Sequence, residues 1–113
     1  MAAQKLYEWE AKAYPKFRDI RMGKEDAEMY YKKFARHFKV SEPLVGKPLR
    51  RVGGVYWGRT NTIQLEKLPT FGTVIHEFAH HLASKEYGGR QFHNKNFKRS
   101  LKRVYTFAKR YIK

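Results

Sequence analysis

The chain has no cysteine among its 113 residues. This absence excludes disulfide bonds, catalysis by a thiolate and a zinc ribbon built from cysteines. No stretch approaches the roughly 20 consecutive apolar residues that cross a bilayer, and residues 1–8 lack the charged-then-apolar order of a signal peptide. We therefore expect no membrane partner and an intracellular location, either cytoplasmic or with the chromosome in a nucleoid or nucleus.

Acidic residues are scarce as well. The sequence has 10 Asp and Glu against 25 Lys and Arg, which gives a formal net charge of +15 at pH 7. Such an excess favours a polyanionic partner, because cations placed along phosphates release condensed counterions. A solvated basic surface without such a partner is the alternative. The cations concentrate towards the C-terminus, where residues 87–113 contain no acidic side chain.

The length suits a single domain over residues 1–113, and 42% hydrophobic residues can bury a core. Helical spacing of apolar residues and turn signals at Gly53-Gly54 and Asn61 predict an α+β fold. The predicted elements are a helix over 2–14, a helix after Gly23, strands over Leu49–Val52, Val55–Arg59 and Thr62–Leu65, and helices over Thr73–Tyr87 and about Asn94–Ile112. Thr73 is the expected N-cap of the third helix, and Gly88-Gly89 its expected end.

That third helix carries His76-Glu77-Phe78-Ala79-His80, an H-E-x-x-H motif. Four residues advance a helix by about 400°, so His76 and His80 lie one turn apart on the same face. Two imidazoles so placed can bind one Zn²⁺, and Glu77 borders the metal without ligating it. Glu77 can there take a proton from a zinc-bound water and pass it to the leaving amine. The apolar stripe on the other side of the helix is expected to pack on the sheet: Val74, Ile75, Phe78 and Leu82.

A catalytic zinc needs a third protein ligand, with the fourth position left for water. The downstream candidates are His81, Glu86 and His93. His81 lies about 100° around the helix from His80 and is expected to face solvent, and Glu86 points away if the helix continues. His93 follows the Gly88-Gly89 break, where the chain can turn back to the metal. We therefore predict His93 as the third ligand, with Glu86 as the alternative.

Residues 55–100 resemble the SprT-like zinc metallopeptidases, the group that includes the Spartan-type DNA-repair proteases. The resemblance rests on His-Glu-Phe-Ala-His at 76–80, Tyr-Gly-Gly-Arg at 87–90 and His-Asn-Lys-Asn-Phe-Lys at 93–98. Residues 58–65, Gly-Arg-Thr-Asn-Thr-Ile-Gln-Leu, also look like the family's strand that leads to the active-site helix.

The resemblance implies a small zincin-like domain with N-terminal helices, a short three-stranded sheet, an active-site helix and a C-terminal basic helix. It implies a zinc-dependent endopeptidase that acts on proteins or peptides, with His76, His80 and His93 as ligands and Glu77 as general base and acid. Tyr87 and Tyr105 are the candidate oxyanion donors.

The basic last helix motivates a further hypothesis, that DNA positions the enzyme near DNA-bound proteins. Its candidate contacts are Lys98, Arg99, Lys102, Arg103, Lys109 and Arg110, with Trp9, Tyr56 and Trp57 as candidate stacking residues.

Three alternatives stay open at this level. A minimal gluzincin-type peptidase shares the compact H-E-x-x-H scaffold but uses a downstream glutamate, for which Glu86 is the candidate, and it needs no nucleic acid. The peptidase can also be latent, with one terminus in the cleft. In the third, the chain is a non-catalytic DNA-binding module in which the zinc is structural and fully coordinated by protein.

Overall fold

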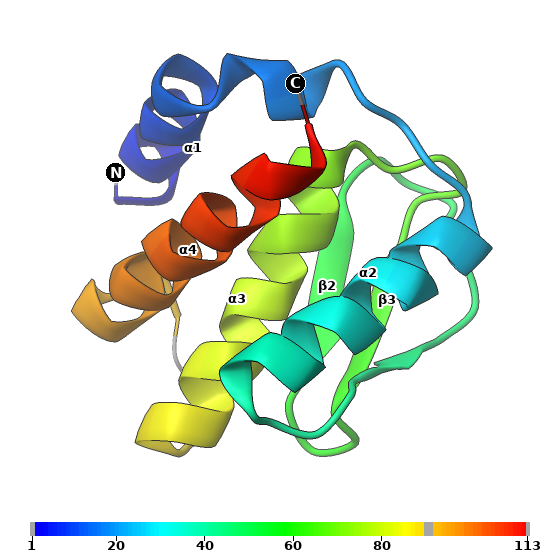
Figure 1. Ribbon diagram of the computed structural model, residues 1–113, viewed down its shortest axis with the longest axis vertical. Coiled ribbons are helices and arrows are strands. Elements are labelled where there is room, and N and C mark those ends of the chain that lie inside the picture. Colours follow the sequence, from blue (N-terminus) through cyan, green and yellow to red (C-terminus); the bar gives the residue numbers. More distant parts are fainter. Residues whose placement is uncertain (1, 90–91, 113) are drawn as a thin grey trace.

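The computed structural model describes residues 2–89 and 92–112 (Figure 1). Its elements, in chain order, are α1 (Ala2–Ala13), a 3₁₀ turn η1 (Pro15–Arg18), α2 (Lys24–Phe38), β1 (Leu44–Val45), β2 (Gly54–Trp57), β3 (Thr62–Leu65), α3 (Phe71–Tyr87), α4 (Lys95–Ala108) and a second 3₁₀ turn η2 (Lys109–Tyr111). The predicted α+β class is confirmed. Among the described residues, no helix combines the length and the apolar character needed to cross a bilayer.

The sheet has the strand order β1-β3-β2 and is mixed. β1 runs parallel to β3, with Leu44 beside Thr62, whereas β2 and β3 form an antiparallel hairpin, with Val55 beside Gln64. Asn61 in the hairpin turn has a φ of 52°, a left-handed conformation that asparagine tolerates better than most residues.

The strand predicted over Leu49–Val52 is wrong. The third strand is β1, and Leu49 makes only an isolated bridge with Glu66. The segment contains Arg50 and Arg51 and ends at Val52, whose side chain is 82% exposed. The edge of β3 that could pair with this segment is occupied by β1, so residues after Leu49 run as a loop beside the sheet.

The long helix α3 runs through the middle of the molecule, with α4 on one side and β2 and β3 on another (Figure 1). Its predicted apolar stripe is buried, but not against the sheet alone. Phe78 packs on the rings of Tyr31 and Phe34 from α2, and the Tyr31 hydroxyl donates to the carbonyl of Val74 at 3.0 Å. The H-E-x-x-H motif therefore lies on a helix with eleven buried residues.

The ends of α3 correct one prediction and confirm another. Thr70, not Thr73, is the N-cap, because its Oγ1 accepts the backbone N–H of Thr73 at 3.1 Å. The helix begins three residues earlier than a Thr73 cap would require. Its C-terminal end lies at Gly88, as predicted, where a φ of 77° suits glycine.

Helix α4 begins after Asn94, whose side chain accepts the backbone N–H of Phe97 at 2.9 Å. It buries one face against α3 and leaves its basic residues exposed, as predicted. The regular helix ends at Ala108, and the last predicted turn is the 3₁₀ segment η2. This packing brings the first turn of α4 beneath the histidines of α3.

Candidate metal centre

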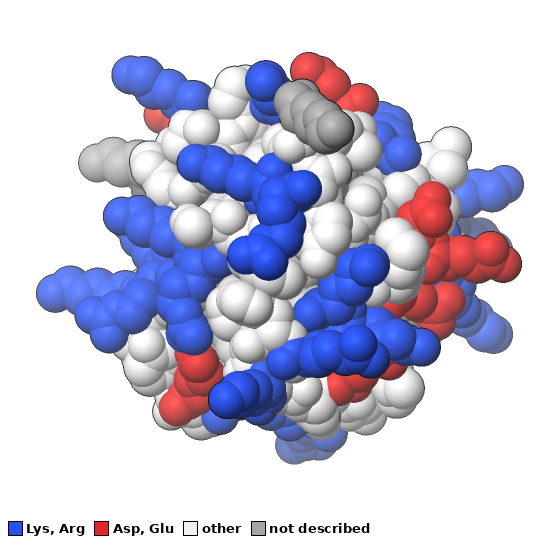
Figure 2. Space-filling view, viewed as in Figure 1, with Lys and Arg blue, Asp and Glu red and all other residues white. Residues whose placement is uncertain are grey.

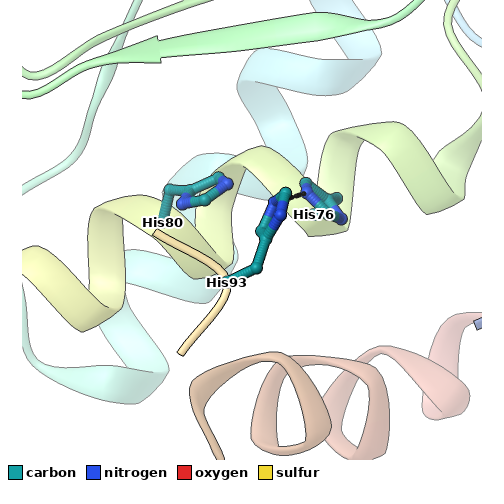
Figure 3. Close-up of side chains that lie close together, drawn as sticks. All are labelled: His76, His80 and His93. Atoms are coloured by element: carbon teal, nitrogen blue, oxygen red, sulfur yellow. Dashed lines mark hydrogen bonds between the residues drawn. The ribbon is translucent and has the colours of Figure 1, made fainter. Parts of the chain in front are cut away.

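Three histidine side chains converge on one point (Figure 3). His76 and His80 project from the same side of α3, and His93 reaches them from the segment before α4. One ring nitrogen from each lies within 4.8 Å of the other two. The Nε2 atoms of His76 and His93 are 3.2 Å apart, close to the spacing of about 3.3 Å between two nitrogens that ligate one tetrahedral zinc. The three residues can therefore hold a metal ion.

Glu86, the alternative third ligand, lies elsewhere. Its carboxylate forms an ion pair with the guanidinium of Arg103 on α4. This pair joins the last turn of α3 to α4 and leaves the centre to the three histidines. His76 is buried at 5% exposure, whereas His80 and His93 are half-buried, so a ligand can approach from their side.

The ring of Phe97 packs against all three imidazoles. Its ring centroid lies 4.1 Å from that of His80, with the rings nearly parallel at 27°, and 5.0 Å from those of His76 and His93. Phe97 is completely buried in the first turn of α4. The sequence placed Phe97 on the apolar face of this helix and four residues after His93, but its contact with all three rings is visible only in the structure.

Glu10 of α1 is a site residue that sequence reasoning missed. One carboxylate oxygen accepts a hydrogen bond from Nδ1 of His76 at 2.9 Å, and the other accepts the hydroxyl proton of Tyr105 at 2.7 Å. Burial disfavours the charged form of His76, but the hydrogen bond and charge of Glu10, with that of Glu77, raise its pKa overall. Glu10 lies 66 residues from His76 in sequence, so no local spacing could have indicated the pairing.

Glu77 is buried beside the histidines, at 6% exposure. Burial raises its pKa to about 7; the charges of His76 and Arg51 oppose the rise, and that of Glu10 adds to it. A carboxyl with a pKa near neutrality can both accept and release a proton at physiological pH. This is the behaviour that the H-E-x-x-H motif requires of its glutamate.

A cleft of about 530 Å³ lies next to the centre. Glu10 of α1 and Tyr105 of α4 line one part of it, and Arg18 of η1 lines another. The rest of its lining comes from the loop 51–53, from Gly54 at the start of β2, from Glu8 and Ala11 of α1, and from Thr70, Gly72, Thr73, His76 and Glu77 at and after the start of α3. The proposed proton carrier and one proposed ligand therefore face the same solvent-filled space.

His81 contradicts its predicted exposure, because it is completely buried. It lies three residues after Phe78 and seven after Val74, which places it on the apolar side of α3. Its Nε2–H donates to the carbonyl of Ser41 at 2.7 Å, and its Nδ1 lies 3.1 Å from the hydroxyl of Tyr56, which also donates to Asn61. Burial lowers the pKa of His81, although the bond to Ser41 opposes this. His81 therefore has a structural role.

The two candidate oxyanion donors are not placed for that task. Tyr105 lines the cleft, but its hydroxyl proton is held by Glu10, and burial with the charge of Glu10 raises its pKa. Tyr87 ends α3, is 39% exposed and does not line the cleft. Arg51 also lines the cleft, and its positive charge opposes the rise in the pKa of Glu77.

The six basic residues singled out on the last helix are all exposed, and Figure 2 shows Lys and Arg side chains spread over the face that α4 presents. Several lie over aromatic rings: Lys102 over Trp9, Arg103 over Phe38, Lys109 over Tyr14 and Arg110 over Phe107. Of the candidate stacking residues, Trp57 is 52% exposed, and its indole N–H donates to Gln64.

Comparisons with protein-family models, with curated proteins and with solved structures found no match to this chain.

Proposed function

We propose that the chain is a zinc-dependent endopeptidase of SprT-like type. The observation that carries the proposal is the convergence of His76, His80 and His93 beside a cleft that the buried Glu77 also lines. The cleft is large enough for a short peptide segment, and the three ring nitrogens, which lie within 4.8 Å of one another, could hold one metal ion. A carboxyl tuned to a pKa of about 7 supports proton transfer as the role of Glu77.

The donor set supports an open metal position. In the described part of the chain, the group of side chains that could hold a metal ion together consists of three histidines. A tetrahedral ion bound by three protein ligands has a fourth position left for water or substrate. A sealed structural site would need a fourth protein ligand. The gluzincin alternative needs a downstream glutamate, and Glu86 is instead paired with Arg103.

A bound Zn²⁺ would supply Lewis-acid polarisation of the scissile carbonyl and acidification of the attacking water. The chain's own residues then do the rest. Glu77 accepts the proton that water loses on attacking the carbonyl carbon, and it delivers that proton to the nitrogen of the departing amine. Arg51 lines the same cleft and is the proposed source of the positive charge that stabilises the developing oxyanion.

The sheet edge supports an extended peptide as substrate. β2 pairs with β3 on one side, and no other strand of the described residues pairs with its second side. Gly53 and Gly54 line the cleft where β2 begins. A peptide added along such an edge gains main-chain hydrogen bonds regardless of its sequence, which suits an endopeptidase of broad specificity.

The test is metal analysis joined to a protease assay on a casein-like substrate. The wild type should bind one zinc and cleave. Glu77→Gln should keep its zinc and lose cleavage by roughly 10²-fold or more, because general acid–base catalysis contributes at least that much. His93→Ala should lose zinc, whereas His37→Ala, which changes an exposed histidine of α2, should change neither zinc content nor cleavage. Cleavage by Glu77→Gln at the wild-type rate would refute the proposal.

We also propose that the basic face of α4 holds the enzyme on DNA. The supporting observation is that Lys98, Arg99 and Lys102 are exposed together on this helix. Figure 2 shows Lys and Arg side chains spread over the face of the molecule that α4 presents. Replacing these three residues by Gln should weaken DNA binding and flatten its salt dependence, because each phosphate contact contributes about −0.9 to the log–log slope. Replacing three exposed cations of α2 (Lys24, Lys32 and Arg36) is the matched control. Equal losses in both triple variants would contradict a site on α4.

A further inference from the structure

We infer that Glu10 and Tyr105 are positioning residues of the metal centre, and that α1 is therefore part of the site and not only a covering helix. The inference rests on the proposed zinc centre but not on peptidase activity. It assigns a function to a buried carboxylate for which the reaction itself has no use.

The contacts form a chain of hydrogen bonds from Tyr105 of α4 through Glu10 to His76. The Tyr105 hydroxyl donates to one oxygen of Glu10 at 2.7 Å, and the other oxygen lies 2.9 Å from Nδ1 of His76. All three side chains are buried, at 2%, 9% and 5% exposure respectively. The other nitrogen of His76, Nε2, lies 3.2 Å from Nε2 of His93. The two ring nitrogens of His76 thus face different partners, the carboxylate on one side and the metal position on the other.

A carboxylate so deeply buried is unfavourable unless its oxygens are satisfied. Among the described residues, no Lys or Arg pairs with Glu10, and its ion-pair partner is His76. Nδ1 must carry the proton to donate to Glu10, so the lone pair of Nε2 is left for the ion. The adjacent negative charge also makes Nε2 a stronger donor to a cation, the effect by which second-shell carboxylates tune metal sites.

Tyr105 is itself held rigidly. Its ring stacks on Tyr14 with centroids 4.0 Å apart and planes 2° from parallel, and the edge of Phe17 packs against it at 5.1 Å. A Cβ at Gly72 would lie 3.4 Å from the Tyr105 hydroxyl, so α3 closes the other side. The hydroxyl therefore has little freedom to leave Glu10, and Glu10 has little freedom to leave His76.

This geometry couples metal binding to the docking of α1. If Glu10 strengthens the bond between His76 and the ion, then the ion must stabilise the position of Glu10 by the same free energy. Zinc should slow hydrogen exchange of the backbone amides in residues 8–13, although α1 donates no ligand. No such effect is expected if Glu10 only fills space.

The first experiment measures zinc affinity by competition with a chromophoric chelator, in variants that circular dichroism shows to be folded. Glu10→Ala should bind zinc roughly 10–100-fold more weakly. Glu10→Gln keeps the shape and an acceptor for Nδ1–H but loses the charge, so it should also be weakened, by less. Tyr105→Phe should lose a few-fold. Glu25→Gln, at an exposed carboxylate of α2 that does not line the cleft, is the control and should leave zinc affinity unchanged.

The second experiment compares hydrogen exchange with and without zinc. Zinc-dependent protection of residues 8–13 should appear in the wild type and be reduced in Glu10→Gln. The absorption spectrum of the Co²⁺-loaded protein should also change in Glu10→Gln, since the donor strength of His76 changes. Glu10→Gln with wild-type zinc affinity and wild-type protection would overturn the inference, because a packing role survives that substitution.

The failures of the two proposals are distinguishable. A wild type that binds zinc with the expected dependence on Glu10, yet cleaves no peptide, refutes the peptidase and leaves the positioning role intact. A cleaving wild type whose zinc affinity ignores Glu10 refutes only the positioning role. A wild type that binds no zinc refutes both.

Discussion

Gly54 of β2 lies directly against Glu77 of α3. A Cβ built at Gly54 would lie 2.8 Å from Cγ of Glu77 and 3.2 Å from its Oε2. The first distance is shorter than any ordinary carbon–carbon contact, so any other residue here would displace the glutamate or push β2 away from α3. Glu77, the proposed proton carrier, can therefore occupy its position only because residue 54 has no side chain.

We therefore predict that Gly54→Ala lowers peptidase activity by roughly 10–100-fold while zinc remains bound, because a displacement of about 1 Å can reduce a rate that much. The backbone at Gly54 does not need a positive φ, so the loss would come from the contact with Glu77. Zinc content and initial cleavage rates are the measurements. Gly58→Ala is the control, since its new Cβ would lie 3.8 Å from its nearest neighbour, an ordinary contact.

The raised pKa of Glu77 predicts a pH-dependent effect on stability. In the metal-free protein, the pKa rises from 4.5 in the unfolded chain to about 7 in the fold. The neutral form is therefore favoured by folding, and its contribution is fully present below pH 4.5 and lost as the pH rises through about 7. At pH 8 the buried charge costs on the order of 3 kcal/mol.

Glu77→Gln removes that charge and should raise the free energy of unfolding at pH 8, with a much smaller gain at pH 5. Urea unfolding in the presence of a chelator measures the difference. Glu25→Gln, an exposed carboxylate in the first turn of α2, is the control and should show no such pH-dependent gain. An equal gain from Glu77→Gln at both pH values would contradict the buried-charge explanation.

Phe97 predicts a link between packing and metal binding. Its ring contacts all three imidazoles and is completely buried. Phe97→Ala should destabilise the protein by about 3–5 kcal/mol, as for other buried aromatics, and Phe97→Leu by less. Both variants should weaken zinc binding, and Phe97→Ala more than Phe97→Leu, because the three imidazole rings gain more freedom to move when more of the Phe97 side chain is removed. Phe107→Leu, which is also buried in α4 but packs on α2, should lower the melting temperature without changing zinc affinity.

The local part of the site could be predicted from the sequence. His76, Glu77 and His80 lie on one helix, where spacing dictates direction, and the glycines at 88 and 89 allow His93 to return. Residue pairs distant in sequence could not be predicted. Glu10 meets His76 across 66 positions and Tyr105 across 95, and no periodicity encodes such contacts.

Two other errors had the same origin in tertiary context. The loop 49–52 has residues that suit a strand, but the neighbouring edge of β3 is occupied by β1. His81 was predicted to face solvent because it lies about 100° around the helix from His80, yet its two ring nitrogens lie within hydrogen-bond distance of Tyr56 and Ser41. A polar residue can be buried wherever such partners exist, and the partners come from other elements.

The buried His81 predicts acid sensitivity. Burial lowers its pKa below the usual 6.5, so the unfolded chain binds more protons than the fold in the pH range just below 6.5. The stability that His81 contributes is therefore fully present above about pH 6.5 and is lost as the pH falls through its lowered pKa. The raised pKa of Glu77 changes stability in the opposite direction over the same pH range, so the contribution of His81 is measured as the difference between the wild type and His81→Gln in urea unfolding of the metal-free protein. His81→Gln should lower the free energy of unfolding by about 1–2 kcal/mol at pH 7.5, for the weakened hydrogen bonds, and by less at pH 5.5. Lys32→Gln, a change at an exposed position of α2, is the control and should show no such pH-dependent difference. An equal loss from His81→Gln at both pH values would mean that the acid sensitivity does not come from His81.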